Sequence, residues 1–506
     1  MSTTYDVTEA PPPAAPATPD GGRATRRGRW IDHWEPEDPT FWAATGQRIA
    51  RKNLGWSVFA EHLGFCIWSI WAIVVINLGN IGITLSVPEQ FWLTATPNLI
   101  GSALRIPYTF ALPRFGGRVW TLISALLLLV PTTLLALVVP SGWLAGQSHD
   151  TQMMVLLLCA ATAGVGGGNF SSSMANISFF YPEGKKGFAL GLNAAGGNLG
   201  VAVTQLVVPL VIILGVSGAA VKLPVHHVHL AYAGLLFLPL IALAAFGAWM
   251  YMDSLTQART DTEAYKNAVR QPQTWVMSLL YIGTFGSFIG YSFALPLVIK
   301  NTFPEFLGHH PFIATYLAGL GFAGALIGSL ARPLGGAVSD RIGGARVTLA
   351  AFAGMAIATL VAIEGVHRHS FATFFISYMV IFLLAGAGNG STYRMIPAIF
   401  AQLGRRAGGD GDTMLSFKRQ TAAVIGIAGA IGAFGGFLIQ VAFRQASLDV
   451  SALMKAARDP AEKAAIAGAH QDWSVSALWV FTAAYVLLAV MTYIFYLRPG
   501  AAHRNV

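Results

Sequence analysis

Two arginines lie in the middle of long apolar segments, where a charged side chain is costly. Arg105 stands within the run 89–112, and Arg332 stands within the run 312–338. Each precedes a basic turn by nine residues, or about 13 Å along a helix, which is near the middle of a hydrocarbon layer about 30 Å thick. An arginine at that depth costs at least roughly 2.5–3.5 kcal/mol. Because a guanidinium presents a planar fork of donors to oxyanions, the pair predicts a binding site for a small anion.

Membrane helices must position these two arginines. Of 506 residues, 54% are hydrophobic and only 11% are charged, whereas an ordinary soluble protein carries about 25% charged residues. This composition excludes a soluble enzyme and a disordered protein, and two cysteines, Cys66 and Cys159, cannot form a disulfide scaffold. The sequence predicts an all-α membrane protein with twelve transmembrane helices, in the apolar runs 56–84, 89–112, 119–140, 152–181, 187–215, 229–252, 274–299, 312–338, 346–365, 371–402, 420–443 and 473–496.

The net charge of +9 is explained by basic loops rather than by nucleic-acid binding, because the basic residues are scattered between apolar runs. Loops after even-numbered runs are the more basic ones, which places both termini in the cytoplasm under the positive-inside rule. The mixed-charge loop 444–472 is long, and long loops are weak topological evidence. The basic residues concerned are Arg114, Arg118, Lys185, Lys186, Arg259, Lys266, Arg270, Arg341, Arg346, Arg405, Arg406, Lys418 and Arg419.

The chain repeats itself around the two arginines. Arg105 precedes the turn 114–117 by the same spacing with which Arg332 precedes the turn 341–344, and the two copies are offset by 227 residues. A weaker repeat relates residues 168–171 to residues 388–391. We therefore expect two pseudo-symmetric six-helix halves, with the substrate site near the midplane between them.

A buried arginine can also be paired with a carboxylate or can snorkel to the interface, and the sequence disfavours both. Pairing is disfavoured because the second, fourth, fifth, seventh, eighth, tenth and eleventh runs have no Asp or Glu in their interiors. Snorkelling would have to span about 13 Å, which is too far for the side chain. Aromatic rings could enclose a flat anion instead, although core or lipid packing explains any single ring at least as well. The candidates are Phe65, Phe170, Tyr281, Phe285 and Phe288.

Small and polar residues mark several of the same helices. Asn176, Asn193 and Asn198 lie within apolar helices and each needs a partner, which is either the substrate or a neighbouring helix. Glycines at spacings of three or four allow helices to approach closely. Gating by sliding and tight static packing both explain them. These glycines are Gly164, Gly168, Gly196, Gly197, Gly200, Gly429, Gly432 and Gly436.

Long motifs in the stretches 34–54, 169–180, 191–200 and 281–290 make the chain, from about 30 to 498, similar to the nitrate/nitrite porter family of the major facilitator superfamily. The resemblance implies that Arg105 and Arg332 bind the anion and that Phe170, Tyr281 and Phe285 flank it. It also matches Asn198 to a substrate-site asparagine. The stretch around 308–310 and the loop 444–472 depart from the family pattern and put external gating in doubt, but not the central site.

The expected function is nitrate/nitrite antiport by alternating access. The helix interiors offer few titratable groups, with Glu61 and His62 near the start of the first run and Glu364 at the end of the ninth. A site with two uncompensated arginines should cross the membrane only when an anion fills it. Proton-coupled nitrate symport is the alternative, and a nitrate sensor without transport is a third. An enzyme is disfavoured, because the histidines lie at helix ends or in loops and no metal cluster or catalytic carboxylate pair is apparent.

We expect a cytoplasmic, partly disordered segment 1–55, a six-helix bundle 56–252, a cytoplasmic linker 253–273, a second bundle 274–498 and a cytoplasmic tail 499–506. The resemblance places the protein in a bacterial inner membrane, as a monomer surrounded by lipid bilayer. Nitrate and nitrite are the expected partners, with no nucleic acid, no metal and no cofactor.

Overall fold

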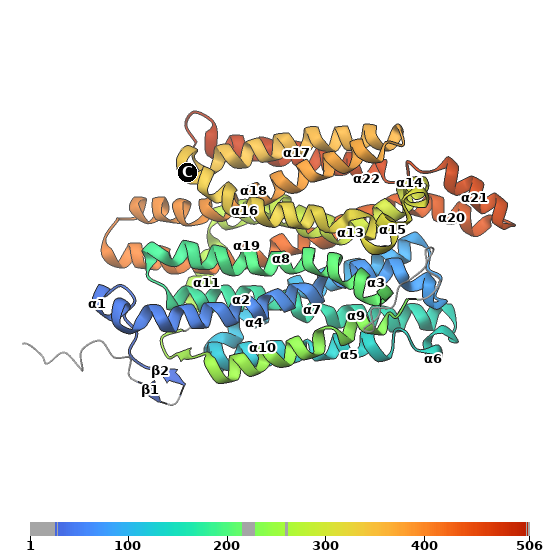
Figure 1. Cartoon of the computed structure of the whole chain (residues 1–506). Coiled ribbons are helices and arrows are strands. Elements are labelled where there is room, and N and C mark those ends of the chain that lie inside the picture. The colour runs from blue at the N-terminus through green and yellow to red at the C-terminus, as the bar shows by residue number, and fades with distance from the viewer. Residues whose placement is uncertain (1–25, 28, 215–227, 259–261, 502, 504–505) are drawn as a thin grey trace, which may run out of the picture.

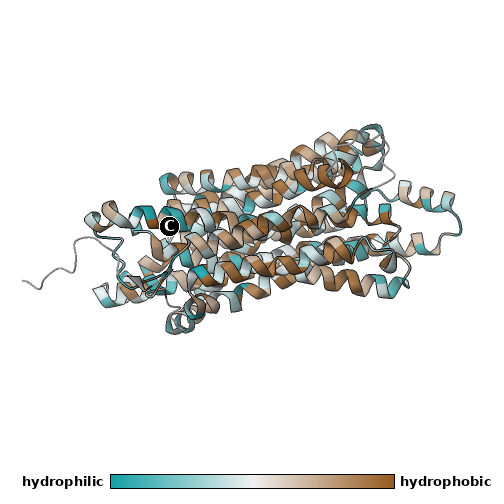
Figure 2. Cartoon of the chain, turned by 60° about the horizontal axis from the view of Figure 1, so that its bottom comes forward, coloured by the Kyte–Doolittle hydropathy of each residue, from teal (hydrophilic) through white to brown (hydrophobic). Residues whose placement is uncertain are grey.

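Long helices run side by side along a common axis in the computed structural model, which describes residues 26–27, 29–214, 228–258, 262–501, 503 and 506 (Figure 1). Hydrophobic residues dominate the middle of the bundle, and hydrophilic residues gather at its two ends (Figure 2). This distribution matches a hydrocarbon layer flanked by water. The described parts of the two chain ends lie at the same end of the bundle (Figure 1).

Residues 39–251 form the first set of helices, which begins with a short capped turn. The side chain of Asp38 accepts hydrogen bonds from Thr40, which hold the pKa of Asp38 below its usual value. The helices and helical turns are α1 (Pro39–Phe41), η1 (Trp42–Gly46), α2 (Gln47–Ser69), α3 (Trp71–Asn77), η2 (Leu78–Ile81), α4 (Val87–Leu127), α5 (Leu129–Leu137), α6 (Gly142–Ala145), α7 (His149–Phe180), α8 (Glu183–Leu214), α9 (Ala231–Leu235) and α10 (Phe237–Tyr251).

Residues 262–497 form the second set. Its elements are α11 (Thr262–Arg270), α12 (Pro272–Tyr281), η3 (Ile282–Gly286), α13 (Ser287–Thr302), α14 (Pro304–His309), α15 (Pro311–Tyr316), η4 (Ala318–Leu320), α16 (Gly321–Ile342), α17 (Gly344–His367), α18 (Phe371–Arg406), α19 (Gly411–Ala446), α20 (Leu448–Ala456), α21 (Pro460–Ala469), α22 (Val475–Thr492) and η5 (Tyr493–Leu497). The loop 444–472 thus contains two short helices, α20 and α21, which project from the bundle (Figure 1).

Ten helical segments of the described chain are long and apolar enough to cross a membrane. One of them, Val87–Leu137, covers the second predicted run and all but the last three residues of the third, so the ten segments account for eleven of the twelve runs. The eighth run falls on α16, which carries three charged residues and is not among the ten. The predicted all-helical membrane fold is therefore observed, while the count of twelve spans stays a prediction.

The two duplicated turns have the same backbone feature. Gly116 interrupts α4 with a φ of 76°, and Gly343 separates α16 from α17 with a φ of 94°. Both are the third residue of the matched turns, and a positive φ is a conformation that glycine adopts without strain. The repeat predicted from the sequence thus extends to the local geometry.

The structure describes the polar head from residue 26 onward, apart from residue 28, whereas residues 1–25 of the predicted partly disordered segment lie outside the described residues. Strands β1 (Arg26–Arg27), β2 (Trp30–Ile31) and β3 (Ser254–Leu255) form a small sheet in that order, with β2 parallel to β3. Helix α2 begins at Gln47, nine residues before the predicted apolar run. Asp253, which is fully buried, is bound by Lys52 at 2.9 Å and donates its backbone N–H to Asn53 at 2.9 Å. The head is therefore attached to the segment that connects the two sets of helices.

Candidate anion-binding site

Arg105 lies on α4 with its side chain completely buried. Its Nε donates to the carbonyl oxygen of Gly167 on α7 at 3.1 Å, and its Nη1 donates to the carbonyl oxygen of Gly429 on α19 at 2.7 Å. Its Nη2 has no hydrogen-bond partner among the described residues. The guanidinium is thus held from two sides and has one nitrogen left for a ligand.

Local sequence explains how a backbone carbonyl comes so close to Arg105. Residues 166–168 of α7 are three consecutive glycines, and a Cβ at Gly167 would lie only 2.5 Å from the ring of Trp68 on α2. Without side chains at these positions, α7 approaches both α2 and α4 closely. The glycine run therefore exposes the carbonyl oxygen that orients Arg105.

Arg332 lies on α16 and is 6% exposed. Its Nη2 donates to the hydroxyl of Tyr281 on α12 at 3.3 Å, and its Nη1 has no partner within the described parts of the chain. Neither Arg332 nor Arg105 forms an ion pair within 4.0 Å among the described residues. Two arginines from the two sets of helices therefore each present one unused donor.

The ring of Phe170 on α7 lies close to both guanidinium groups. The centroid of its ring is 4.7 Å from Cζ of Arg105 and 5.9 Å from Cζ of Arg332. Phe285 is also close to Arg105, with its centroid 5.1 Å from Cζ, and its ring stacks on both Phe170 and Tyr281. Phe170, Tyr281 and Phe285 thus form one cluster with both arginines, and Phe65 joins it through an edge contact with Phe170 at 5.9 Å.

A small anion would satisfy this arrangement chemically. Burying a guanidinium without a counter-charge is unfavourable, and an unused buried donor adds to the cost. A planar oxyanion could accept from the unused nitrogens of both arginines, while the aromatic walls exclude water and strengthen each contact. The site holds no cluster of three or more potential metal ligands within the described residues.

One carboxylate lies closer to the site than the sequence suggested. Because α2 starts at Gln47, Glu61 is well inside that helix and not near its start, and it is completely buried. Its Oε2 accepts from Nδ2 of Asn169 at 3.4 Å, whereas its Oε1 has no partner in the described structure. Asn169 directly precedes Phe170, and a Cβ at Gly197 would meet both Glu61 and Phe65, so Glu61 borders the aromatic cluster that surrounds Arg105. Our expectation that no carboxylate lies near the arginines therefore needs correction, although Glu61 forms no ion pair with either of them among the described residues.

The three predicted asparagines lie at different places. Asn198 on α8 is buried, and neither atom of its amide has a partner in the described structure. Asn193 donates to Oγ of Ser173 at 2.7 Å, so a helix–helix contact already uses its amide nitrogen. Asn176 packs against Gly117 of α4 and lies six residues beyond Phe170 on α7, or about 9 Å along the helix. Asn198 and Asn176 therefore both keep a whole amide without a protein partner in the described structure, and Asn198 directly follows Gly197, which packs against Phe65 of the cluster.

All of the predicted glycines except Gly429 lie at close contacts between helices. Gly429 borders the site itself, since a Cβ there would be 3.8 Å from Nη1 of Arg105. Gly432 packs against Tyr281, Gly436 against Asn98 and Gly197 against Glu61 and Phe65. The remaining contacts are those of Gly164 with Ile100, Gly168 with Leu104, Gly196 with Val58 and Gly200 with His62 and Cys66. Tight packing explains each contact, and gating stays a prediction.

Two further aromatic residues belong to the cluster but were not predicted. The ring of Trp68 is 5.5 Å from Cζ of Arg105, and the ring of Tyr393 is 5.5 Å from Cζ of Arg332. The hydroxyl of Tyr393 has no partner in the described part of the chain. Tyr393 follows the 388–391 repeat on α18, so the repeat could have indicated it. The remaining predicted ring, Phe288, packs edge-on against Phe382 and makes no cation–π contact with either arginine in the described structure.

This fold and this site are those of a membrane carrier, and residues 53–440 match the Major Facilitator Superfamily. The chain belongs to that superfamily. Its fold is similar to a D-xylose–proton symporter (TM-score 0.63, 15% identity, covering 90% of this chain and 100% of that one) and to an inward-facing bacterial homologue of the lysosomal transporter Spinster (TM-score 0.57, 16% identity, covering 88% and 96%).

Within the superfamily, the chain is a member of the nitrate/nitrite porter family. It is 39% identical to the nitrate/nitrite transporter NarU of Escherichia coli over 81% of this chain and 88% of the relative. It is 36% identical to a probable nitrate/nitrite antiporter NarK2 of Thermus thermophilus, again over 81% of this chain and 88% of the relative. The family resemblance noted in the sequence and the predicted fold class are therefore confirmed.

Proposed function

We propose that this protein moves nitrate and nitrite across a bacterial inner membrane by alternating access, with one anion exchanged for the other. The observation that carries the proposal is the convergence of Arg105 and Arg332 on Phe170, with one unused guanidinium nitrogen on each arginine. Nitrate and nitrite are small, flat, monovalent oxyanions that such a pair can hold. The relatives named above carry the same two anions in their names.

Alternating access requires the two sets of helices to rearrange around the site. The bond from Arg105 to Gly429 joins α4 to α19, and Nε2 of Gln205 on α8 donates to the carbonyl oxygen of Ser292 on α13 at 2.5 Å. Glu183 on α8 and Lys418 on α19 form an ion pair of 3.0 Å. This pair lies near the N-terminal ends of both helices, whereas Gln205 lies in the C-terminal half of α8. These contacts cross between the sets, so the transport cycle must break some of them.

Exchange follows from the electrostatics of the site. Without a ligand, the positive charge of the two arginines outweighs the carboxylate of Glu61, the one buried beside the cluster among the described residues, so crossing a low-dielectric layer is costly. A bound monovalent anion offsets that charge and lowers the cost. Return of the site with a second anion then avoids the costly empty state.

A flux assay in liposomes clamped at a fixed pH tests this function. Exchange predicts that nitrate enters only when nitrite or nitrate is present inside, and that an imposed proton gradient does not change the rate. Vesicles without protein and vesicles with heat-inactivated protein serve as controls. Absence of nitrate movement under every condition would favour a sensor over a carrier.

Proton-coupled nitrate symport is the second candidate, and Glu61 is the observation that favours it. A buried carboxylate that borders the aromatic cluster, and has one oxygen without a hydrogen-bond partner in the described structure, could carry a proton together with the anion. Strong nitrate uptake into anion-free vesicles, driven by external acid, is the result that would select symport over exchange.

We further propose that both termini face the cytoplasm and that the protein works as a monomer in the lipid bilayer. The described parts of the two chain ends lie at one end of the bundle (Figure 1), and the loops with the most basic residues support a cytoplasmic position for that end. We assign one helical bundle to residues 56–252, the second to 274–498, the linker to 253–273 and the tail to 499–506. A single chain contributes both arginines of the site.

A further inference from the structure

A groove separate from the anion site lies between α2 and α8. It has a volume of about 530 Å³ and is lined by one face of each helix, together with the Trp42 region that precedes α2. None of the residues of the anion site lines it. Phe188 and Leu192, which border it on α8, are 76% and 45% exposed, whereas Asn193 and Gly197 on the same helix are buried among neighbouring helices. The groove therefore opens to the outside of the bundle.

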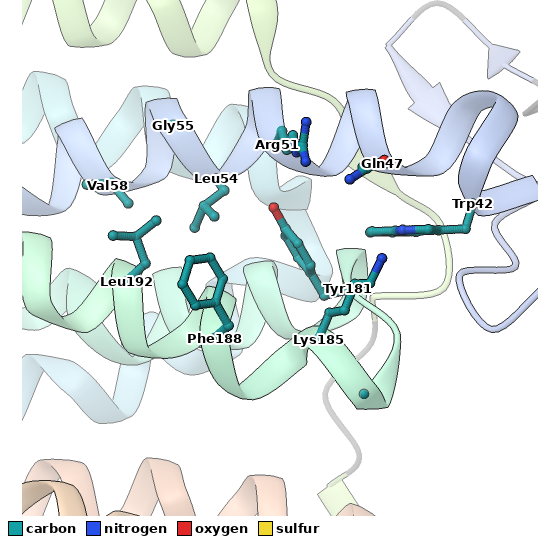
Figure 3. A pocket seen from close by; sticks show the side chains of 11 residues that line it. Trp42, Gln47, Arg51, Leu54, Gly55, Val58, Tyr181, Lys185, Phe188 and Leu192 are labelled. Atoms are coloured by element: carbon teal, nitrogen blue, oxygen red, sulfur yellow. The ribbon is translucent and has the colours of Figure 1, made fainter. Parts of the chain in front are cut away.

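The groove has a charged end and an apolar end (Figure 3). Arg51 and Lys185 lie at one end, beside the rings of Trp42 and Tyr181. Nζ of Lys185 is 5.5 Å from the ring of Trp42, and that ring packs against Tyr181 at 5.6 Å. Basic residues beside tryptophan and tyrosine are typical of the interface between a membrane and water. This end therefore suits an anionic group held at the membrane surface.

Apolar side chains continue from the charged end along both helices. Leu54 and Val58 line one wall, and Phe188 and Leu192 line the other (Figure 3). Val58 is seven residues beyond Arg51, and Leu192 is seven residues beyond Lys185, or about 10 Å deeper in the membrane in both cases. A Cβ at Gly55 or Gly184 would meet no atom within 4 Å, so these positions leave the groove open.

We propose that this groove binds an anionic phospholipid of the cytoplasmic leaflet. Its phosphate would lie between Arg51 and Lys185, and one acyl chain would follow the apolar walls. Charge complementarity favours this occupant, because two basic side chains and no carboxylate line the groove among the described residues. The N-terminal segment of this chain is a poorer occupant, because Arg23, Arg26, Arg27 and Arg29 make its sequence between residues 23 and 29 basic.

Lipid retention by the purified full-length protein tests the proposal without reference to nitrate. The protein is reconstituted with equal amounts of phosphatidylglycerol and phosphatidylcholine, and the bound lipids are counted by native mass spectrometry. We expect preferential retention of phosphatidylglycerol. The double variant R51A/K185A should lose about 30-fold in affinity for it, since each basic residue near an anionic surface contributes about fivefold.

Two further variants separate the groove from general effects of charge. K266A/R270A removes two exposed basic residues of α11 and should leave retention unchanged. Gly55→Leu keeps both charges but fills the apolar part, and it should reduce retention of phosphatidylglycerol. Equal retention of the two lipids by the wild type would overturn the proposal. So would unchanged retention in R51A/K185A, or crosslinking of a photoreactive group at Val58 to residues 1–25 instead of to lipid.

Discussion

Arg105 of α4 donates a 2.7 Å hydrogen bond to the backbone carbonyl of Gly429 in α19. The two residues are 324 positions apart, and they belong to different sets of helices. A carbonyl dipole orients the guanidinium without neutralising it, so Arg105 stays available to an anion. Because the bond crosses between the sets, it also reports the conformation of the carrier: a rocking motion that separates α4 from α19 must release this nitrogen.

The planar geometry of each guanidinium should contribute more to nitrate binding than its positive charge alone. Arg105→Lys and Arg332→Lys keep a positive group but lose bidentate donation, and each should weaken nitrate binding by about 10- to 100-fold, the loss expected for one charge-assisted hydrogen bond of roughly 1.5–3 kcal/mol. Calorimetric titration of the purified protein measures this effect. Arg270→Lys, an exposed position on α11, is the matched control. Normal affinity in either site variant would contradict the bidentate arrangement.

The aromatic rings should contribute to nitrate binding through the contacts that their faces make with the two arginines. Phe170→Ala removes the ring shared by both arginines, and we expect nitrate affinity to fall by roughly tenfold, in line with a desolvated cation–π contact of about 1–2 kcal/mol. Phe285→Ala should act in the same direction. Tyr281→Phe retains the ring and deletes only the hydroxyl that accepts from Arg332, so its effect should be smaller. If binding is unchanged in all three variants, the rings serve only to pack the core.

Replacement of a glycine by a larger residue should destabilise the protein at one position of α8 and not at another. A Cβ at Gly200 would collide with the backbone oxygen of His62 on α2, whereas a Cβ at Gly191 would meet nothing within 4 Å. Gly200→Ala should therefore lower the midpoint of thermal unfolding by several degrees, because overpacking costs about 1–3 kcal/mol. Gly191→Ala should leave the midpoint unchanged. Equal midpoints for the two variants would show that α8 can shift away from α2 at little cost.

Glu61 distinguishes the two coupling modes. In Glu61→Gln the amide keeps the volume of the side chain and its polar contact with Asn169, so nitrate/nitrite exchange should continue at fixed pH. Tracer exchange in vesicles loaded with nitrite measures this rate. If the variant instead loses an acid-driven uptake that the wild type possesses, the carboxylate carries the proton and symport replaces exchange.

Features that repeat, or that span many residues, could be predicted from the sequence. Apolar runs predict the helices, and the matched spacing of Arg105 and Arg332 indicates a shared site. The glycine of each matched turn, Gly116 or Gly343, has a positive φ in both copies. Such features depend on residue types and spacings that can be recognised directly in the sequence.

Contacts between distant segments determine the features that could not be predicted from the sequence. The backbone carbonyl of Gly429 has no side chain to suggest a role, and its position beside Arg105 follows from the packing of α19 on α4. Glu61 looks like a residue at the edge of a span, because polar residues at 47–53 hide the true start of α2. Trp68 resembles an ordinary core residue in the sequence, although its ring lies beside Arg105 in the fold.

Nitrate counterflow tests the central claim most directly, namely that Arg105 and Arg332 together form the site of a nitrate/nitrite carrier. Vesicles containing wild-type protein, Arg105→Lys, Arg332→Lys or the control Arg270→Lys are loaded with nitrite and diluted into labelled nitrate at fixed pH. We predict rapid nitrate entry for the wild type and the control, and entry reduced at least about tenfold in both site variants. Wild-type vesicles that take up no nitrate, or site variants that transport at the wild-type rate, would contradict the account.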